Sequence, residues 1–477
     1  MHWIHPATAM ATLTARHAPG FLAFALAFAG ATHAQPRLES PRVLPEGVQL
    51  RWQADPAQPS AYTVQVRGPG LDDLWVVPPA TFPWPTTALE WLDARPLADS
   101  LWYRVLAVPP AERGQLLSTS SIRNYTVIEL GFIFGLAGIP LTPEHPVALH
   151  KLVYETVGPW GERRQASGVI AIPQKAGVAW PLVTYQHGTL AKRSEAPSAN
   201  ALGEVLLGVA FATAGYVAVL PDYLGLGDSA GVHPYHHARS HATTGVDALR
   251  AARRFCAANS VELNDRLFVC GYSQGGYAAL AVLRELEQFH ADEFPVTAAA
   301  TMAGAYDLSG VTTDDFLSDR PMPSPYYFAL LLAAYQEVYR LAPTLADLLT
   351  PPYDTTLPPL LQGQHTGGEI DARMPAVPTQ ALKPAYLAAF RANPQHPLRQ
   401  ALRDNDLIRW RPQSALRLYH CDGDQAVSPA NADAALASFH AAGATQVQLF
   451  NPQPGAGHGD CSEPSLLAAK AWFDSLR

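Results

Sequence analysis

The chain has 477 residues, which is too long for one ordinary hydrophobic core, so we expect at least two domains. Hydrophobic residues make up 48% of the sequence and charged residues 16%, a composition that excludes a disordered or fibrous protein. The formal net charge is -8 and no run of Lys and Arg occurs, so we expect no nucleic-acid partner.

The N-terminus has the pattern of a secretory signal peptide. Basic residues precede an apolar run at residues 21–29 (FLAFALAFA), and a small-residue cleavage pattern ends at Ala34. The apolar run is shorter than a membrane span. We therefore predict a signal peptide over residues 1–34, cleaved near Ala34, and a secreted or periplasmic protein. The sequence leaves open whether translation starts at Met1 or Met10.

Residues 36–125 contain runs in which apolar and polar side chains alternate. Examples are residues 48–52 (VQLRW), 62–66 (YTVQV) and 102–107 (WYRVLA), separated by Pro, Gly and Asp. A period of two is typical of half-buried strands, so we predict a small antiparallel β-sandwich. Its aromatic spacing resembles that of fibronectin type III modules. Whether this module is a spacer or binds a surface or polymer stays open.

From residue 126 onward, short apolar runs alternate with stretches of helical periodicity. The strand-like runs are 167–173, 181–185, 216–221, 267–272, 296–302, 416–421 and 446–451, and helix-like stretches include 243–258, 275–289 and 431–442. Strands that alternate with helices indicate a mainly parallel sheet covered on both faces. We therefore predict an α/β domain over residues 126–477.

Residues 305–412 depart from this alternation. They combine helical apolar spacing, as in 325–335 (PYYFALLLAAY), with many prolines. A structureless loop of this length is uncommon in a compact domain, so we predict a helical cap over the carboxyl edge of the sheet. Its segment 326–335 either lines an acyl pocket or acts as an interfacial lid, or belongs to the core of the cap itself.

Residues 185–189 (YQHGT) follow one of the early strand-like runs. Negative charge that develops on a carbonyl oxygen is stabilised by a pair of backbone N–H groups, an oxyanion hole, with one N–H from the residue after a nucleophile and one from a loop near the third strand. We predict the N–H groups of Gln274 and Thr189 for these positions.

Four histidines, His233, His236, His237 and His241, cluster in one stretch of the sequence (HPYHHARSH). Metal sites of this kind combine histidine with Cys or carboxylate ligands at defined spacing, and such partners are missing here. We therefore expect neither a metal nor a cofactor, and interpret the stretch as leading into the following helix.

The clearest catalytic motif is residues 271–275 (GYSQG), which matches G-x-S-x-G. It follows a strand-like run and precedes a helix-like stretch, the context that exposes a serine on a sharp turn. Glycines on both sides permit the turn, and the N-terminus of the helix favours developing negative charge. We predict Ser273 as the nucleophile.

A serine hydroxyl needs a histidine to accept its proton and a carboxylate to orient that histidine. Both should follow the serine along the chain. Residues 420–429 (HCDGDQAVSP) come after a strand-like run, and we predict Asp424 as the acid, with Asp422 as the alternative. Residues 454–459 (PGAGHG) follow the next run, and His458 is the predicted base.

Four cysteines, Cys256, Cys270, Cys421 and Cys461, fit an oxidising compartment and allow three pairings of two disulfides. Spacing alone does not choose among the pairings. A bridge between Cys421 and Cys461 would tie the acid loop to the histidine loop.

These motifs together resemble the α/β-hydrolase superfamily, particularly its secreted esterases and lipases with a helical cap. The resemblance rests on residues 181–189 (PLVTYQHGT), 221–229 (PDYLGLGDS), the serine motif and the two later loops, and covers residues 126–477. It implies an α/β-hydrolase fold that cleaves carboxylic esters through an acyl-enzyme. Asp222 precedes Ser273 in a motif whose carboxylate usually fixes a loop, so we interpret Asp222 as structural.

Ester hydrolysis is thus the leading hypothesis, with a small-molecule, lipid or polymer ester as substrate. Because the same triad cleaves amides, a serine peptidase or amidase is the alternative. A third hypothesis is a non-catalytic adhesive protein that uses the fibronectin-like module. The sequence leaves open the acyl chain length, the oligomeric state, and whether the cap or the N-terminal module contacts an interface or polymer.

Overall fold

The structure is a computed structural model of the whole chain. It describes residues 9–14, 23–27, 37–44, 47–54, 61–67, 88–93, 100–108, 112–200 and 203–477.

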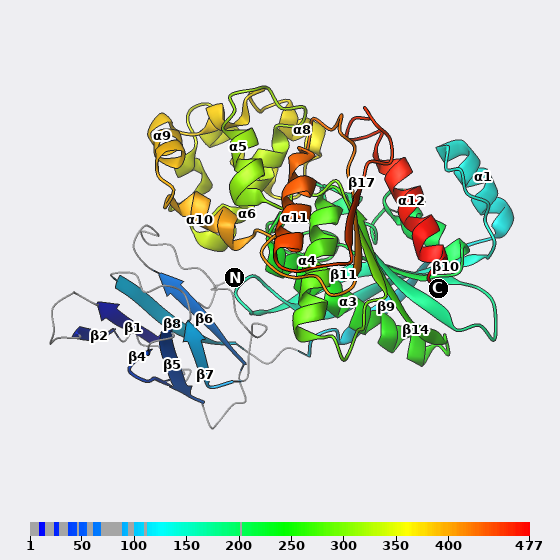
Figure 1. Cartoon of the computed structure of the whole chain (residues 1–477), viewed down its shortest axis with the longest axis horizontal. Coiled ribbons are helices and arrows are strands. Elements are labelled where there is room, and N and C mark those ends of the chain that lie inside the picture. Colours follow the sequence, from blue (N-terminus) through cyan, green and yellow to red (C-terminus); the bar gives the residue numbers. More distant parts are fainter. Residues whose placement is uncertain are drawn as a thin grey trace.

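The N-terminal part forms two small antiparallel sheets (Figure 1). One sheet has the order β2-β1-β8-β6, from β1 (Ala9–Thr14), β2 (Ala23–Ala27), β6 (Ala61–Arg67) and β8 (Ser100–Val108). In the other, β5 (Gly47–Gln53) pairs with β3 (Arg37–Leu38), β4 (Arg42–Leu44) and β7 (Glu90–Asp93). Trp52, Tyr62 and Tyr103 are buried, and the first two rings meet edge to face. The small all-β part is therefore confirmed, while its resemblance to fibronectin type III remains a prediction.

Two of these strands fall inside the predicted signal peptide. β1 pairs along its length with β8, and β2 pairs with β1. The signal peptide remains a prediction. Cleavage near Ala34 would remove β1 and β2 from the sheet and leave the pairing of β6 with β8 in place.

The predicted boundary at residue 125 is wrong. β9 (Leu116–Tyr125) pairs with β10 of the large sheet, so the chain has entered that sheet by Leu116. Most side chains of β9 are exposed because it is an edge strand. Its sequence (LLSTSSIRNY) is mostly polar and has no apolar face, so it does not show whether the strand belongs to the small sheets or to the large one.

A sheet of nine strands forms the centre of the described part of the chain, in the order β17-β16-β15-β14-β12-β13-β11-β10-β9. Neighbours from β13 through β12 to β17 are parallel, and β9, β10 and β11 are antiparallel. The remaining strands are β10 (Val147–Val157), β11 (Arg163–Pro173), β12 (Trp180–Gln186), β13 (Val217–Pro221), β14 (Leu263–Tyr272), β15 (Ala298–Met302), β16 (Ala415–Tyr419) and β17 (Val447–Phe450).

Helices cover both faces of this sheet (Figure 1). One face packs against α3 (Ala238–Ala258), α4 (Gln274–Phe289) and α11 (Ala430–Ala441). The other packs against α1 (Val127–Ala137), α2 (Val205–Thr213) and α12 (Ser462–Asp474). Every residue of the central strands β12, β13 and β15 is buried, as two-sided coverage requires. The predicted α/β architecture is confirmed.

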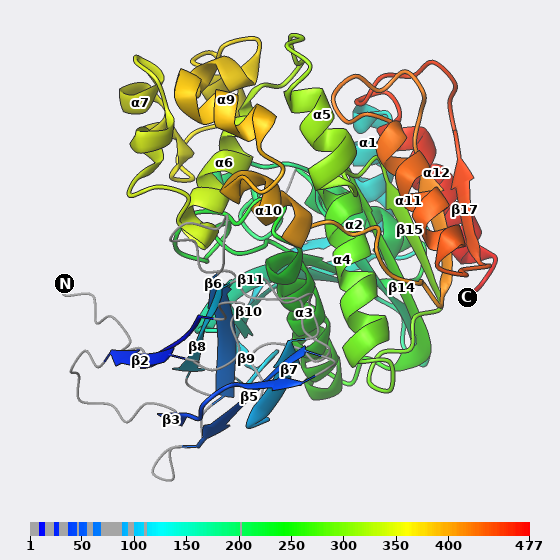
Figure 2. The same cartoon turned by 60° about the vertical axis from the view of Figure 1, so that its left-hand side comes forward.

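The region between β15 and β16 is helical, and its helices gather at one end of the sheet (Figure 2). They are η2 (Leu308–Thr312), α5 (Thr313–Phe316), α6 (Tyr326–Tyr339), η3 (Leu345–Leu348), α7 (Tyr353–Thr356), η4 (Pro358–Leu361), α8 (Gly367–Asp371), η5 (Pro378–Ala381), α9 (Pro384–Ala392) and α10 (Pro397–Asp404). A further short helix, η1 (Arg193–Glu195), follows β12. Within the described residues, every helix falls short of the length or apolarity that crossing a bilayer demands.

Candidate active site

Ser273 lies between the end of β14 and the first turn of α4. Its backbone has a φ of 59°, in the left-handed region, and its N–H donates to the Met302 carbonyl at 2.9 Å. The turn also requires close backbone packing, because a Cβ added at Gly275 would lie 1.9 Å from the Gln186 carbonyl oxygen. Sequence pattern and structure thus agree on a strained serine held at a helix N-terminus.

The structure brings Ser273 together with His458 and Asp424. The Ser273 Oγ lies 2.8 Å from His458 Nε2, and His458 Nδ1 lies 2.6 Å from Asp424 Oδ2. Because the ionised carboxylate only accepts hydrogen bonds, Nδ1 carries the proton and Nε2 is left to accept from the serine hydroxyl. The three side chains form a continuous hydrogen-bonded chain.

The Asp424 carboxylate is buried and has four donors. Oδ1 accepts from the N–H groups of Ala426 and Val427, each at 2.9 Å, while Oδ2 accepts from both His458 and His420. Burial acts to raise the pKa of Asp424, but hydrogen bonds from His420 and His458 outweigh it and hold the pKa well below the usual carboxyl range. Asp424 therefore stays ionised.

His420 is a residue of this site that the sequence did not reveal. It lies just beyond β16 with its side chain buried, and Nε2 donates to Asp424 Oδ2 at 3.1 Å and to the Val427 carbonyl at 3.0 Å. Its spacing of four residues before Asp424 is a weak signal, because a histidine at a strand end has many structural uses.

Asp422, the alternative acid, is placed differently. Its Oδ1 accepts from the Gly455 N–H at 2.6 Å, so it supports the loop before His458. The loop that carries Asp424 and the loop that carries His458 pack closely against each other. A Cβ added at Gly423 would lie 2.3 Å from the Gly455 carbonyl oxygen, so only glycine fits there. Asp424, rather than Asp422, is the carboxylate that is hydrogen-bonded to His458.

The hypothesis of a bridge between the two loops is confirmed. Cys421 and Cys461 form a disulfide with a Cα–Cα distance of 5.9 Å, and both residues are buried. Cys256 and Cys270 are buried free thiols. Burial raises the pKa of Cys256 to about 12 and raises that of Cys270 as well, so neither is a reactive thiolate.

Tyr272, the residue before Ser273, contacts His458 through both its hydroxyl and its ring. Its hydroxyl donates to the carbonyl of His458, and the two rings lie 5.2 Å apart. The tyrosine occupies a variable position of the G-x-S-x-G motif, so the motif gave no sign of this contact.

Gln274 is the first residue of α4, and its side chain is anchored on the histidine cluster (His233, His236, His237 and His241). Gln274 Nε2 lies 2.6 Å from His233 Nε2, and His233 Nδ1 lies 2.8 Å from the Leu224 carbonyl. The carbonyl fixes the proton on Nδ1, so Nε2 accepts from the glutamine. Burial lowers the pKa of His233 to about 4, which keeps the ring neutral.

All four histidines of the cluster are buried. Burial lowers the pKa of His236 and of His237 to about 3, and that of His241 well below its usual value. Among the residues that the structure describes, no group of three or more His, Cys, Asp or Glu side chains is arranged to hold a metal ion.

Thr189 follows β12, and its hydroxyl lies 3.0 Å from the hydroxyl of Tyr235. Tyr235 and Gln274 both line the pocket beside Ser273. The predicted donor loop is thus next to this pocket, while the role of the Thr189 N–H remains a prediction.

Asp222 accepts hydrogen bonds from the hydroxyls of Ser167 and Ser198 and from the Ser198 N–H. It is fully buried, and burial raises its pKa. These contacts join β11 to two loops, in agreement with the structural role expected for Asp222.

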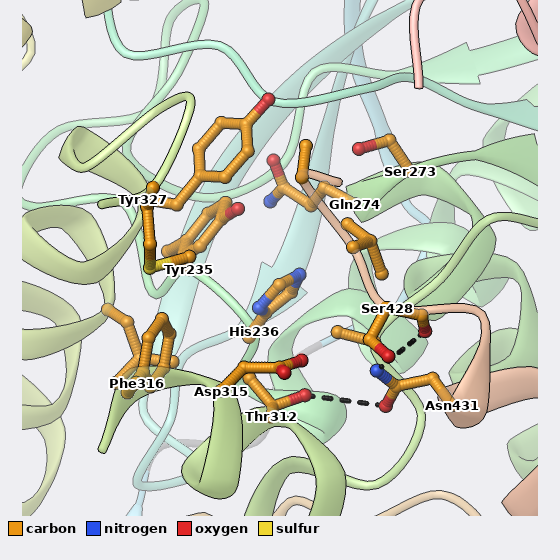
Figure 3. Close-up of a pocket in the computed structure, with 15 residues that line it drawn as sticks. Tyr235, His236, Ser273, Gln274, Thr312, Asp315, Phe316, Tyr327, Ser428 and Asn431 are labelled. Atoms are coloured by element: carbon orange, nitrogen blue, oxygen red, sulfur yellow. Dashed lines mark hydrogen bonds between the residues drawn. The ribbon is translucent and has the colours of Figure 1, made fainter. Parts of the chain in front are cut away.

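A pocket opens from Ser273 toward the cap (Figure 3). Its apolar and aromatic lining comes from Tyr235, Ala305, Phe316, Met322, Tyr327, Leu331, Ala426 and Val427, and its polar lining includes His236, Gln274, Thr312, Asp315, Ser428 and Asn431. On α6, Tyr327 and Leu331 face this pocket, while Phe328 and Leu332 line a second cavity inside the cap. The segment 326–335 therefore serves both as pocket wall and as cap core.

The chain is similar in structure to known hydrolases. A ligand-bound form of the rice cell wall degrading esterase LipA from Xanthomonas oryzae is 28% identical, with a TM-score of 0.68, covering 76% of this chain and 100% of that chain. A Legionella pneumophila protein described as a hydrolase is 25% identical, with a TM-score of 0.70, covering 76% of this chain and 98% of its own. The chain has the α/β-hydrolase fold.

One stretch of the chain matches a family of lipases. Residues 192–314 of this α/β hydrolase match the model of a family described as Secretory lipase. Candida antarctica lipase A in its closed state is 15% identical, with a TM-score of 0.58, over 77% of this chain and 83% of that one, a likeness of fold alone. A search of curated proteins finds no match. The family match and the esterase neighbour support ester hydrolysis and an extracellular location.

Proposed function

We propose that this α/β hydrolase is a secreted serine esterase that cleaves carboxylic esters through an acyl-enzyme on Ser273. The observation that carries the proposal is the hydrogen-bonded chain from Ser273 Oγ through His458 to Asp424, at 2.8 and 2.6 Å. This arrangement has the geometry that a nucleophile, its base and an orienting acid need.

In the first half of the reaction, Ser273 Oγ attacks the ester carbonyl carbon while His458 Nε2 accepts the hydroxyl proton. The carbonyl oxygen becomes an oxyanion, to which the N–H groups of Gln274 and Thr189 donate. The tetrahedral intermediate collapses, the bond to the alcohol oxygen breaks, and His458 gives its proton to that oxygen. The alcohol leaves and the acyl group stays on Ser273.

In the second half, water takes the place of the alcohol. His458 accepts a proton from the water as its oxygen attacks the acyl carbon, and then returns that proton to Ser273 Oγ as the acid leaves. Throughout, Asp424 remains ionised and stabilises the imidazolium, which fits its lowered pKa and its four donors.

The pocket supports an acyl group with apolar character. Phe316, Met322 and Leu331 supply apolar surface within the cap, and Ser273 lies at one side of the same pocket. The X. oryzae neighbour is a cell-wall-degrading esterase, so the substrate panel includes esters of cell-wall polymers.

The test measures hydrolysis of p-nitrophenyl esters of increasing chain length beside aminoacyl nitroanilides. We expect Ser273→Ala and Asp424→Asn each to lower kcat by about 10⁴-fold or more. Asp422→Asn is the matched control, because its carboxylate contacts Gly455 instead, and it should retain most activity. Full esterase activity in Ser273→Ala would reject the site, and a preference for the anilides would favour the amidase alternative.

We also propose that the mature protein begins near Gln35. The Cys421–Cys461 disulfide supports an oxidising compartment. Mass spectrometry of the exported protein tests this, and a mature chain that retains residues 9–27 would contradict it.

A further inference from the structure

Helix α1 leaves a row of large apolar side chains in solvent. The exposed fractions are 86% for Ile128, 68% for Phe132 and 75% for Leu136. Residues four positions apart lie on one side of a helix, so the three side chains form a single line. We call this line, Ile128, Phe132 and Leu136, the α1 face.

The α1 face is unusual within the described residues. The other exposed large hydrophobic side chains, Val43, Leu89, Leu92 and Leu117, are only 36–47% exposed and lie on or beside three different strands, β4, β7 and β9. Isolated exposed apolar residues need no explanation, whereas contiguous ones mark an interaction site.

The helix is folded and anchored, so its exposure is not that of a loose segment. A capping box between Thr126 and Glu129 begins it, and Gly138 ends it in the left-handed conformation. Leu130 and Phe134, on the opposite side of the helix, are buried in the core that α1 shares with α2, α12 and one face of the large sheet.

The charge of α1 restricts what the face can contact. Glu129 is the one charged residue in the helix, and its carboxylate accepts from the Thr126 N–H and hydroxyl and lies 3.8 Å from Arg123. Helices that bind anionic membranes carry Lys and Arg on their polar face, and α1 has neither. An uncharged apolar surface is therefore the matching partner.

The position of α1 connects the face to the active-site loops. The segment after the helix, Ile139 to Leu141, lines a cavity of about 220 Å³ that is also lined by Gly188 and Tyr272. Tyr272 precedes the nucleophile and holds the His458 loop. In Figure 1, α1 stands beside α12, whose Leu466 lines the same cavity.

We propose that the α1 face is a docking surface that inserts into the uncharged apolar surface of an aggregated lipid ester. The helix then lies in the plane of that surface and holds the catalytic loops against it. The ester chemistry of this partner rests on the proposed function, whereas the docking itself does not.

The test measures binding of the full chain to phosphatidylcholine vesicles by co-sedimentation, in a Ser273→Ala background. The variant Ile128→Ser/Phe132→Ser/Leu136→Ser should bind at least about 10-fold more weakly than its parent. The matched control Val43→Ser/Leu89→Ser/Leu92→Ser removes three exposed apolar side chains elsewhere and should bind like the parent.

Activity and association state complete the test. With Ser273 restored, the α1 variant should hydrolyse a monomeric p-nitrophenyl ester at the wild-type kcat/KM, while hydrolysis of an emulsified triacylglycerol falls about 10-fold or more. Equal vesicle binding by parent and variant would overturn the proposal, as would a parent that fails to bind. A dimeric parent that the substitutions convert to a monomer would assign the face to a second copy instead. A wild type that binds vesicles but cleaves no ester would reject the proposed function and leave the docking surface standing.

Discussion

Removing the Cys421–Cys461 disulfide is the perturbation whose magnitude follows most directly from the structure. The bridge joins residues 40 positions apart. In the chain-entropy model, releasing a loop of that length restores unfolded-state entropy worth about 4 kcal/mol at 25 °C. The large domain spans residues 116–477 and has about 2.1 cal/mol/K of unfolding entropy per residue, so this loss of stability lowers its Tm by about 5 °C.

The assay is scanning calorimetry of the Cys421→Ala/Cys461→Ala variant. Cys256→Ala/Cys270→Ala is the matched control, because it removes two other buried sulfurs from the core without removing a cross-link. The difference in Tm between the two double variants therefore isolates the cross-link. Equal shifts would refute the argument, since packing alone would then account for the loss.

Two other predictions concern the histidines. His420→Leu removes a hydrogen-bond donor from Asp424. The loss of a hydrogen bond to a charged group should lower kcat about 10-fold and leave KM unchanged. The acid limb of the pH–rate profile should move to higher pH, because a carboxylate with fewer donors attracts the imidazolium more strongly. His420→Gln, which restores an N–H donor, should recover part of the rate, and a profile that keeps its position in His420→Leu would argue for a purely structural role. Burial lowers the pKa of His233 to about 4, so in the acid range the unfolded chain binds a proton that the folded chain does not. The free energy of unfolding should therefore have its full value above about pH 6.5 and decrease as the pH falls toward 4. At pH 5 the decrease due to His233 alone should be about 2 kcal/mol. Urea unfolding that shows equal stability at pH 7 and pH 5 would contradict this.

The architecture of the large domain was predictable because it depends on local patterns. Apolar runs of strand length alternate with helical periodicity, and buried parallel strands such as β12 and β15 read as continuous apolar segments. The serine motif was equally local, because its glycines, its strand and its helix are all neighbours in the sequence. The boundary at β9 was missed because an exposed edge strand has no apolar face to reveal its partner.

The amino-acid sequence by itself predicted Ser273, Asp424 and His458 as a triad from their chain order and loop composition, and the tertiary structure joins the three side chains by hydrogen bonds. Other features exist only in three dimensions. The pairing of Cys421 with Cys461 and the two histidines on one carboxylate depend on loops that β16 and β17 carry to the same edge of the sheet. The exposure of the α1 face depends on packing as well. Apolar residues occur on every side of this helix, so its sequence does not show which side is buried, and only the tertiary structure buries Leu130 and Phe134 and leaves the α1 face in water.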